Sequence, residues 1–387
     1  RIKATLKFKE LKIYRKYPEA SLLNQLIYQI IAGYDNDKDA DHLRYDPIFR
    51  TILPDGVASQ PTISRFLKRL SDFDSLKSLH DLMSSFITDF FESAPEITRI
   101  LDIDSTHSDT YGKQGGAFYN GHYGTNGYHP FVAFLADSGL LIDAELRPGN
   151  VYTSDGADVF LKEILERHPD QKFVIRADSG FATPKIYDLL EEKQTNYVIR
   201  LKSNSHLQRI AQRLFEDDQT VDFTSVTGTY FYRTAYQAAS WESPRQVIIF
   251  ADRNGKLIPD FQFFITTLTS LSDKDIVKTY RSRGIAENYI KEIKNGFYFN
   301  KTDSSDFFTN EVRMVLSGIA YNLVKLLQHE IFPKSEKKTT IDTIRIKFIK
   351  IGASFARHSR KLWIHLTKSN PYDSQFWWLL DKIQSSP

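Results

Sequence analysis

Short apolar runs alternate with segments of helical length from Thr98 to Leu201, and this alternation restricts the possible fold more than any other feature of the sequence. The runs have the length of buried strands, and the segments between the later runs have the length of helices. Such alternation predicts a mixed α/β domain in which helices pack on a sheet. Strands are expected at 100–104, 131–135, 140–146, 173–178 and 197–201, and helices at about 155–167 and 184–193.

The order of these elements is strand, strand, strand, helix, strand, helix, strand, which resembles that of a ribonuclease-H-like core. Residues 205–268 then break the alternation with β-rich, aromatic sequence and are expected to form an insertion. The core is expected to resume with a helix at about 273–297, and a long helix with one apolar face follows it. The predicted fold class is therefore α/β, with a β-rich insertion in a ribonuclease-H-like core and with helical regions on both sides.

The region before the core, residues 21–94, has apolar residues at helical spacing. A short helix at 60–70 would bury one face and present Gln60, Ser64 and Lys68 on the other. This helix is similar to the recognition helix of a helix-turn-helix. An ordinary amphipathic helix with a solvated basic face is an equally good interpretation, so both stay open. The residues expected on the buried face are Ile63, Phe66, Leu67 and Leu70.

Two basic segments lie near the ends of the chain. Residues 1–20 carry lysines and arginines among apolar residues, which is typical of a basic arm or an edge strand. Residues 334–361 are markedly basic and form a candidate phosphate surface, with a solvated face as the alternative.

The overall composition excludes several classes of site. The sequence contains no cysteine, so neither a disulfide framework nor a thiolate zinc site is possible. No apolar run approaches the roughly 20 residues that span a bilayer, so we expect no membrane partner and a soluble, cytoplasmic protein. The net charge of +3 does not by itself indicate a polyanionic partner, because only local patches act within a Debye length.

Three aspartates stand at or near the ends of predicted strands. Asp102 and Asp104 alternate with apolar residues, so in a strand both carboxylates would point to the same face. Asp178 ends a second strand, directly before Ser179 and Gly180. Ligands of open α/β sheets collect at the carboxyl ends of strands. Each motif alone is also explained by simple turn formation, since aspartate before serine or glycine is common in turns.

A second group of polar residues lies in the helix expected at 273–297. Arg283, Glu287 and Lys294 follow Tyr280 at offsets of 3, 7 and 14. On a helix the four side chains would fall within a stripe about 60° wide. Apolar residues occupy the opposite side, so the helix would bury that side and offer the charged stripe to a ligand. The alternative is a surface helix whose charges are merely solvated.

The Tyr-x2-Arg-x3-Glu-x6-Lys spacing resembles the signature of bacterial insertion-sequence DDE transposases. Segments 101–106 and 176–181 are similar to the strands that carry the first and second aspartates of that family, and 320–323 is similar to a segment of its late helix. The resemblance covers roughly residues 95–330. It implies a transposase that cuts DNA at the ends of an insertion sequence and joins those ends to target DNA.

Carried over by position, the resemblance implies that Asp104, Asp178 and Glu287 form the catalytic triad. These carboxylates would hold two Mg²⁺ ions, which prefer oxygen ligands, with Mn²⁺ able to substitute. Asp104 directly precedes Ser105 and Thr106, as in the family motif, but Asp102 shares its face and stays the alternative first ligand.

The resemblance also implies residues that contact DNA. Tyr280, Arg283 and Lys294 would contact the phosphate beside the cut. Trp241, in the insertion, would stack on an extruded base if a DNA hairpin forms at the excised end. Its alternative role is to pack in the core of the insertion.

The expected partners are double-stranded DNA, as terminal inverted repeats and as target, and a second copy of the chain in a homodimeric DNA complex. The expected location is the bacterial cytoplasm, associated with the nucleoid. Two other functions stay open: a catalytically inactive DNA-binding protein derived from a transposase, and a glycoside hydrolase that pairs Asp102 with Asp104. The expected domains are a DNA-binding region at 1–95, the core at 96–204 and 269–330, the insertion at 205–268 and a basic C-terminal region at 331–387.

Overall fold

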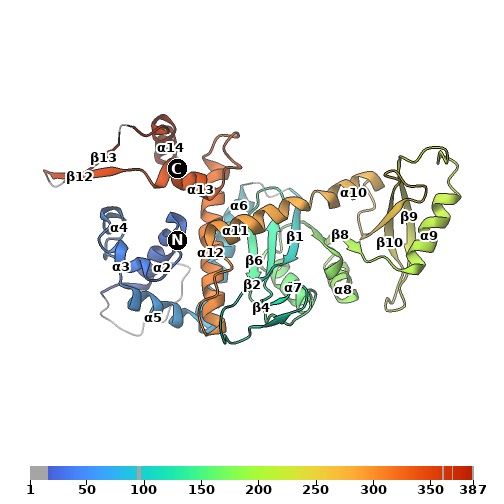
Figure 1. Cartoon of the computed structure of the whole chain (residues 1–387), viewed down its shortest axis with the longest axis horizontal. Helices are drawn as coiled ribbons and strands as arrows, with labels where there is room; N and C mark the ends of the chain where they lie inside the picture. Colours follow the sequence, from blue (N-terminus) through green and yellow to red (C-terminus); the bar gives the residue numbers. More distant parts are fainter. Residues whose placement is uncertain (1–15, 94–96, 360, 368, 386–387) are drawn as a thin grey trace.

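The computed structural model of the chain describes residues 16–93, 97–359, 361–367 and 369–385. Most of the basic arm expected at residues 1–20 lies outside the described residues. Figure 1 shows an elongated arrangement, with the helices of both terminal regions at one end, a sheet in the middle, and strands β9 and β10 at the other end. None of the described helices is long and apolar enough to cross a membrane.

One mixed sheet of eight strands forms the centre of the fold, in the order β6-β5-β1-β7-β8-β11-β10-β9. Strand β1 pairs antiparallel with β5 and parallel with β7, which in turn pairs parallel with β8. The α/β core expected from the sequence is confirmed. Each of its strands begins and ends within one residue of the predicted bounds. These strands are β6 (Leu141–Glu145), β5 (Phe131–Leu135), β1 (Arg99–Ser105), β7 (Phe173–Ala177) and β8 (Asn196–Leu201).

Helices cover both faces of this core, because successive side chains of a strand point to opposite faces. On one face, Phe131 and Leu135 join an apolar cluster with α7 (Ala157–Arg167) and α8 (Pro184–Glu192). On the other face, Val132 and Phe134 join a cluster with α6 (Phe73–Glu92) and with the helices that follow the insertion. All positions of β5 and β7 are buried, which explains their continuous apolar sequences.

The insertion extends the central sheet. It begins with helix α9 (Ser205–Glu216), and its strands β9 (Thr229–Tyr236), β10 (Arg245–Asp252) and β11 (Asp260–Thr266) are all antiparallel. Strand β11 pairs with β8, so the edge of the core is covered by the insertion's own backbone. The insertion and the core therefore share one hydrogen-bonded sheet.

A small three-stranded sheet lies between β1 and β5 in the sequence. It contains β2 (Ser108–Asp109), β3 (Phe118–Asn120) and β4 (Thr125–Tyr128). Its close packing depends on glycine, because a Cβ on Gly127 would lie 2.3 Å from the backbone oxygen of Ser108. The strands have two to four residues, too few for a visible alternation, and the sequence did not predict them.

The helix expected at 273–297 is two helices, α10 (Asp273–Arg281) and α11 (Gly284–Phe297). They are separated by a tight turn, in which the Arg283 amide donates to Tyr280 O at 2.9 Å and the Ala286 amide to Arg283 O at 2.8 Å. The long helix α12 (Phe307–Glu330) follows as expected, and α11 and α12 pack together on one face of the core.

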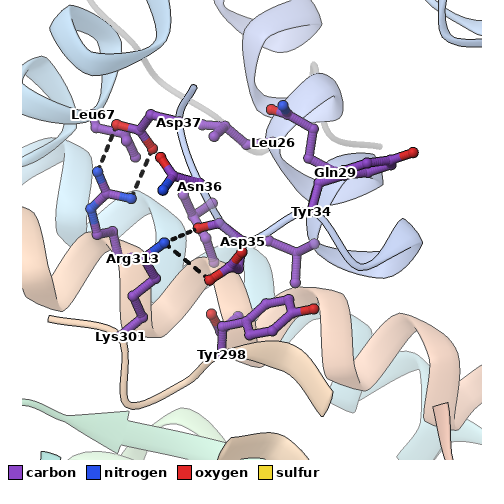
Figure 2. Close-up of a pocket in the computed structure, with 13 residues that line it drawn as sticks. Leu26, Gln29, Tyr34, Asp35, Asn36, Asp37, Leu67, Tyr298, Lys301 and Arg313 are labelled. Atoms are coloured by element: carbon purple, nitrogen blue, oxygen red, sulfur yellow. Dashed lines mark hydrogen bonds and ion pairs between the residues drawn. The ribbon is translucent and has the colours of Figure 1, made fainter. Parts of the chain in front are cut away.

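The N-terminal region is helical, as expected, and is attached to the core by ion pairs. Arg313 of α12 contacts both carboxylate oxygens of Asp37 at 2.7 and 2.9 Å. Lys301 contacts the backbone oxygen and the carboxylate of Asp35. Figure 2 shows these two pairs in direct contact, and all four residues line a small pocket. The helices are α2 (Glu19–Ala32), α3 (Asp39–Leu43), α4 (Pro47–Ile52), α5 (Gln60–Leu70) and α6.

The C-terminal region begins with helix α13 (Ile341–Ile344) and a π-helical turn (Arg345–Ile349). A two-stranded hairpin follows, formed by β12 (Ala353–His358) and β13 (Lys361–Leu366). Helix α14 (Asp373–Ser385) is the last described element. The hairpin projects away from the rest of the molecule in Figure 1.

Candidate active site

Asp104 and Asp178 lie at the carboxyl ends of the neighbouring parallel strands β1 and β7. Asp178 begins a short 3-10 turn, and its carboxylate accepts from the Gly180 amide at 2.8 Å. Burial raises the pKa of Asp104 to about 6, against the lowering effect of Arg283, and the negative charge of Asp178 adds to the increase. The two carboxylates are thus close enough to repel one another in a partly desolvated place, where a cation would be stabilised.

Asp102 points to the same face of β1 but has a different environment. Its carboxylate forms a two-point contact with Arg176 of β7, at 2.5 Å from Nε and 2.6 Å from Nη2. Both side chains are 1% exposed. Arg176 Nη1 also donates to Thr279 O in the last turn of α10 and to the Ser282 hydroxyl in the turn between α10 and α11. Asp102 is therefore engaged in holding that turn against the sheet, and Asp104 is the β1 carboxylate that faces Asp178.

Helix α11 lies along the end of β1 and is held there at two points. Arg283 Nη2 donates to the Asp104 carboxylate at 2.7 Å. Lys294 Nζ donates to His107 O at 2.7 Å and lies 3.3 Å from the Thr106 hydroxyl oxygen. Burial lowers the pKa of Lys294. The polar stripe of α11 therefore faces the edge of the sheet that carries the aspartates.

Tyr280 completes the stripe from the end of α10. Its ring packs on Phe264 of β11, with centroids 4.7 Å apart. Burial raises the pKa of Tyr280, which Arg283 and Arg200 oppose, and the charges of Asp178 and Asp104 add to the increase. The tyrosine is thus close to both carboxylates.

Glu287 is the member of the predicted triad that the structure leaves apart. Its side chain is exposed. Within the described ranges, no three histidine, aspartate or glutamate side chains lie close enough together to hold a metal ion. Arg283 is the group that contacts Asp104 instead. The structure thus brings Asp104 and Asp178 together, and leaves Glu287 at the surface of α11.

An open cavity lies beside Asp178, with a volume of about 470 Å³. One wall is the β3–β4 turn, including His122, and the other is the loop at 149–153. Lys202 lies at its edge, where its ammonium donates to the Tyr152 hydroxyl at 2.9 Å. The second aspartate is therefore accessible from a groove that also offers a cation.

The family model described as transposase DDE domain group 1 matches residues 1–387. The chain belongs to this family of DDE transposases. Its members cleave and transfer DNA strands and generally depend on divalent metal ions, so this protein is a transposase and an enzyme.

Comparison with solved structures gives distant similarities. A structure of the piggyBac transposase synaptic complex with hairpin DNA matches over 100% of this chain and 77% of that chain, with 14% identity and a TM-score of 0.49. The Mos1 transposase paired-end complex with the left transposon end matches over 55% and 75%, with 13% identity and a TM-score of 0.19. A search of curated proteins found no match.

The sequence left two roles open for Trp241 of the transposase: stacking on a base, or packing in the core of the insertion. Its side chain is 8% exposed and belongs to the apolar cluster of α7, α8 and the sheet. Its ring packs edge-on against Tyr187 and Tyr236, with centroids 5.5 Å away in both cases. This arrangement corresponds to the core-packing alternative, and contact with an extruded base stays a prediction.

Helix α5, the candidate recognition helix, buries the four apolar residues expected of it. Its opposite face is partly occupied by the transposase itself. The Ser64 hydroxyl donates to the Asp37 carboxylate at 3.0 Å and accepts from the side-chain amide of Gln60 at 2.9 Å, while the backbone N–H of Gln60 donates to Asp41 at 3.1 Å. Lys68 is exposed. Of the three side chains expected to face a ligand, Ser64 contacts an acidic residue of the N-terminal region and Gln60 contacts Ser64.

The basic C-terminal segment divides in a similar way. Arg345 is 3% exposed and donates to the backbone oxygens of Ile30, Ile31 and Gly296, so it joins α2 to α11. Lys347 contacts Glu336 at 2.9 Å. These two cations have a structural role, and only the remainder of the segment is available to a phosphate.

Sequence reasoning missed two groups near the site. Arg176 interrupts an otherwise apolar strand, and a charge in a fully buried strand signals a buried partner. Tyr123 stacks on His107 with centroids 4.5 Å apart. Burial raises the pKa of Tyr123, and the charges of Asp104 and Asp178 contribute, so its hydroxyl is near the acidic pair. No pattern in the sequence marks Tyr123, because it lies in a short turn.

Proposed function

We propose that this transposase performs cut-and-paste transposition: it hydrolyses DNA at the ends of an insertion sequence and joins the freed 3′ hydroxyls to target DNA. The observation that carries the proposal is the pair Asp104 and Asp178, on adjacent strand ends, facing the polar stripe of α11. Its substrate is double-stranded DNA, as terminal inverted repeats and as target.

The residues fit a divalent metal ion. Two carboxylates with hard oxygen donors lie together at the half-buried ends of β1 and β7, where burial, with a contribution from the charge of Asp178, raises the pKa of Asp104. A bound divalent cation would offset the cost of holding both carboxylates charged. We propose that Asp104, Asp178 and Glu287 hold two Mg²⁺ ions, with Mn²⁺ able to substitute. Such ions supply activation of the attacking oxygen and stabilisation of the leaving oxygen in an in-line displacement.

Glu287 would reach this place from the helix face it already shares. It follows Arg283 by four residues and precedes Lys294 by seven, and on a helix the three directions lie within about 40° of one another. Because Arg283 and Lys294 both contact the β1 end, Glu287 lies between two anchored positions. A rotamer change at Glu287 would turn its carboxylate toward Asp104 and Asp178.

Arg283 would exchange its partner when DNA binds. Its Nε is buried and has no hydrogen-bond acceptor among the described residues, while Nη2 contacts Asp104. A phosphate beside the cut would take both donors in a two-point contact, which arginine geometry favours. Lys294 and Tyr280 would orient the same strand, and the release of Asp104 would leave its oxygens to the metal.

Two ends must be brought together for excision, so we propose that a homodimer acts in the DNA complex, in the bacterial cytoplasm and associated with the nucleoid. An inactive DNA-binding protein is the second candidate, and the outcome of a cleavage assay separates the two. The glycoside hydrolase alternative requires Asp102 and Asp104 to act together on a sugar. Asp102 is unsuitable for this, because it is buried in an ion pair with Arg176.

The test uses a linear duplex that carries the terminal inverted repeats of the element, with Mg²⁺, Mn²⁺ or EDTA. Wild type should nick or cut at the repeat ends only with metal, and Asp178→Asn and Glu287→Gln should bind the duplex normally and cut at least about a thousandfold more slowly. Lys185→Gln, on the exposed side of α8, is the matched surface control and should cut normally. Full activity of Glu287→Gln would contradict the triad, and tight binding without cleavage in either metal would favour the inactive protein.

A further inference from the structure

The β12–β13 hairpin is the part of the described chain whose purpose the fold does not explain. The two strands form a sheet of their own, with no third strand among the described residues. An isolated two-stranded hairpin is only marginally stable in water. Yet the hairpin projects from the body and exposes large side chains, with Trp363 52% and Ile364 42% exposed. Such a hairpin would be stabilised by packing against a binding partner.

The charge of this part of the chain is of one sign. Residues 343–372 contain no aspartate or glutamate. Arg345 and Lys347 have their contacts inside the protein, but Arg357 and Lys361 lie exposed near the tip of the hairpin. The lysines and arginines of the segment are Arg345, Lys347, Lys350, Arg357, Arg360, Lys361 and Lys368.

Strand register separates the hairpin into two faces. His358 pairs with Lys361, Ala356 with Trp363, and Ser354 with His365, so these six side chains share one face. That face presents Trp363 between a lysine and a histidine, over the small Ala356. The opposite face is apolar except for Arg357 near the tip, and is built from the pairs Ala353 with Leu366, Phe355 with Ile364, and Arg357 with Leu362.

We propose that the β12–β13 hairpin is a second DNA-binding element, which places its Lys361 and Trp363 face on a duplex outside the active site. The proposal rests on the proposed function, because it assigns a further part of the same DNA to this arm. Charge complementarity selects the partner: an acid-free basic segment suits a polyanion, and counterion release from phosphates would supply the affinity.

The shape of the hairpin agrees with this partner. A two-stranded β-ribbon has the width that the major groove of B-DNA admits. Seated there, Trp363 would make apolar contact with the sugar or base edges, and Lys361 would reach a phosphate at the rim of the groove. Arg357, which lies on the opposite face, would extend around the edge of the two-stranded ribbon to a second phosphate. The competing occupant is a second copy of the chain on the apolar face. It would leave the acid-free composition unexplained.

The experiment measures binding of the full-length protein to a fluorescein-labelled, mixed-sequence duplex by anisotropy, in EDTA, from about 50 to 200 mM KCl. The test variant is Arg357→Ala with Lys361→Ala, and Trp363→Ala is measured separately. The control is Lys162→Ala with Lys185→Ala, which removes the same charge from exposed positions of α7 and α8. Circular dichroism confirms that each variant is folded.

We expect the hairpin double variant to weaken binding and to reduce the slope of log K against log salt by about 1.8, since each lost phosphate contact accounts for about 0.9. Trp363→Ala should weaken binding at an unchanged slope, and the control should do neither. Wild-type slope and affinity in the hairpin variant would overturn the proposal. So would a Phe355→Ser variant that loses dimer mass in light scattering while the hairpin double variant binds DNA normally.

The binding data and the cleavage assay together separate this proposal from the proposed function. If the wild type cuts the repeat duplex and Asp178→Asn does not, the function stands, whatever the hairpin variants do. If the hairpin variants then bind as the wild type does, only the hairpin proposal fails.

Discussion

Arg176 and Asp102 form a buried two-point ion pair between β7 and β1, and the same guanidinium contacts the turn that joins α10 to α11. The pair therefore fixes the start of the polar helix stripe relative to the two strands that carry Asp104 and Asp178. It also explains why two aspartates on one face of β1 have different roles.

Loss of either partner should destabilise the fold. Asp102→Ala would leave a guanidinium that is 1% exposed without its counter-charge, and we expect a loss of about 3–5 kcal/mol in the free energy of unfolding. Urea denaturation measures it. Asp104→Ala is the matched comparison on the same strand, and it should cost far less, because Asp104 is at the open edge. Equal losses in the two variants would contradict the division of roles. A double variant, Asp102→Leu with Arg176→Met, should recover part of the loss.

Trp241 should matter for stability rather than for DNA contact. Trp241→Ala removes a buried ring between Tyr187 and Tyr236, and we expect a loss of about 3–5 kcal/mol. Trp241→Phe should keep most of the stability and normal cleavage of the repeat duplex. Thermal unfolding and the cleavage assay together decide the matter. Normal stability of Trp241→Ala with a selective loss of cleavage would instead favour the role in base stacking.

Stability should fall between about pH 4.5 and 7 because of Glu311. Burial raises the pKa of this carboxyl from 4.5 to about 7, with His80 opposing the increase and Glu145 adding to it. The folded state then holds the proton more tightly than the unfolded state, so the contribution is complete below pH 4.5 and is lost as the pH rises through 7. The difference corresponds to at most about 3 kcal/mol. Glu311→Gln should remove this part of the pH dependence, making the variant more stable than wild type at pH 8 and similar to it at pH 4.5. An unchanged pH profile in urea unfolding would contradict the assignment.

The attachment of the N-terminal helices should depend on the Asp37–Arg313 pair. Among the residues that the structure describes, Arg313→Ala leaves the Asp37 carboxylate with only the Ser64 hydroxyl. We expect a faster release of the N-terminal region by limited proteolysis, with a loss of about 1–3 kcal/mol in its docking. Arg65→Ala, an exposed arginine of α5, is the control and should behave as wild type. Release at the wild-type rate in Arg313→Ala would show that apolar packing alone holds the region.

The sequence predicted the strands of the core well because they are buried on both faces. A strand such as β5 has no polar side, so its apolar run marks both of its ends. The break between α10 and α11 was missed for the opposite reason. Helical spacing continues through Ser282 and Arg283, and Arg176 contacts the turn from a strand more than 100 residues earlier in the sequence. Such a long-range contact cannot be read from the local pattern.

The candidate site was predicted in part. Asp104, Asp178 and the residues of the stripe could be named, because strand ends and helix faces follow from spacing. The sequence could not show that Asp102 is paired with Arg176, or that Arg283 rather than Glu287 contacts Asp104. Both contacts depend on which side chains meet after folding. The tyrosine beside the acidic pair, Tyr123, lies in a turn of a small sheet that has no sequence pattern.

Strand β11 joins the insertion to β8, and β8 is the immediate neighbour of the strand that leads to Asp178. Bending at this junction would break hydrogen bonds between β8 and β11. We therefore expect β9, β10 and β11 to move with the core as one rigid unit. A displacement of the far end, by DNA or by another protein, would therefore be transmitted through β8 to β7, the strand that directly precedes Asp178. The distance between the insertion and Asp178 is thus set when the sheet forms.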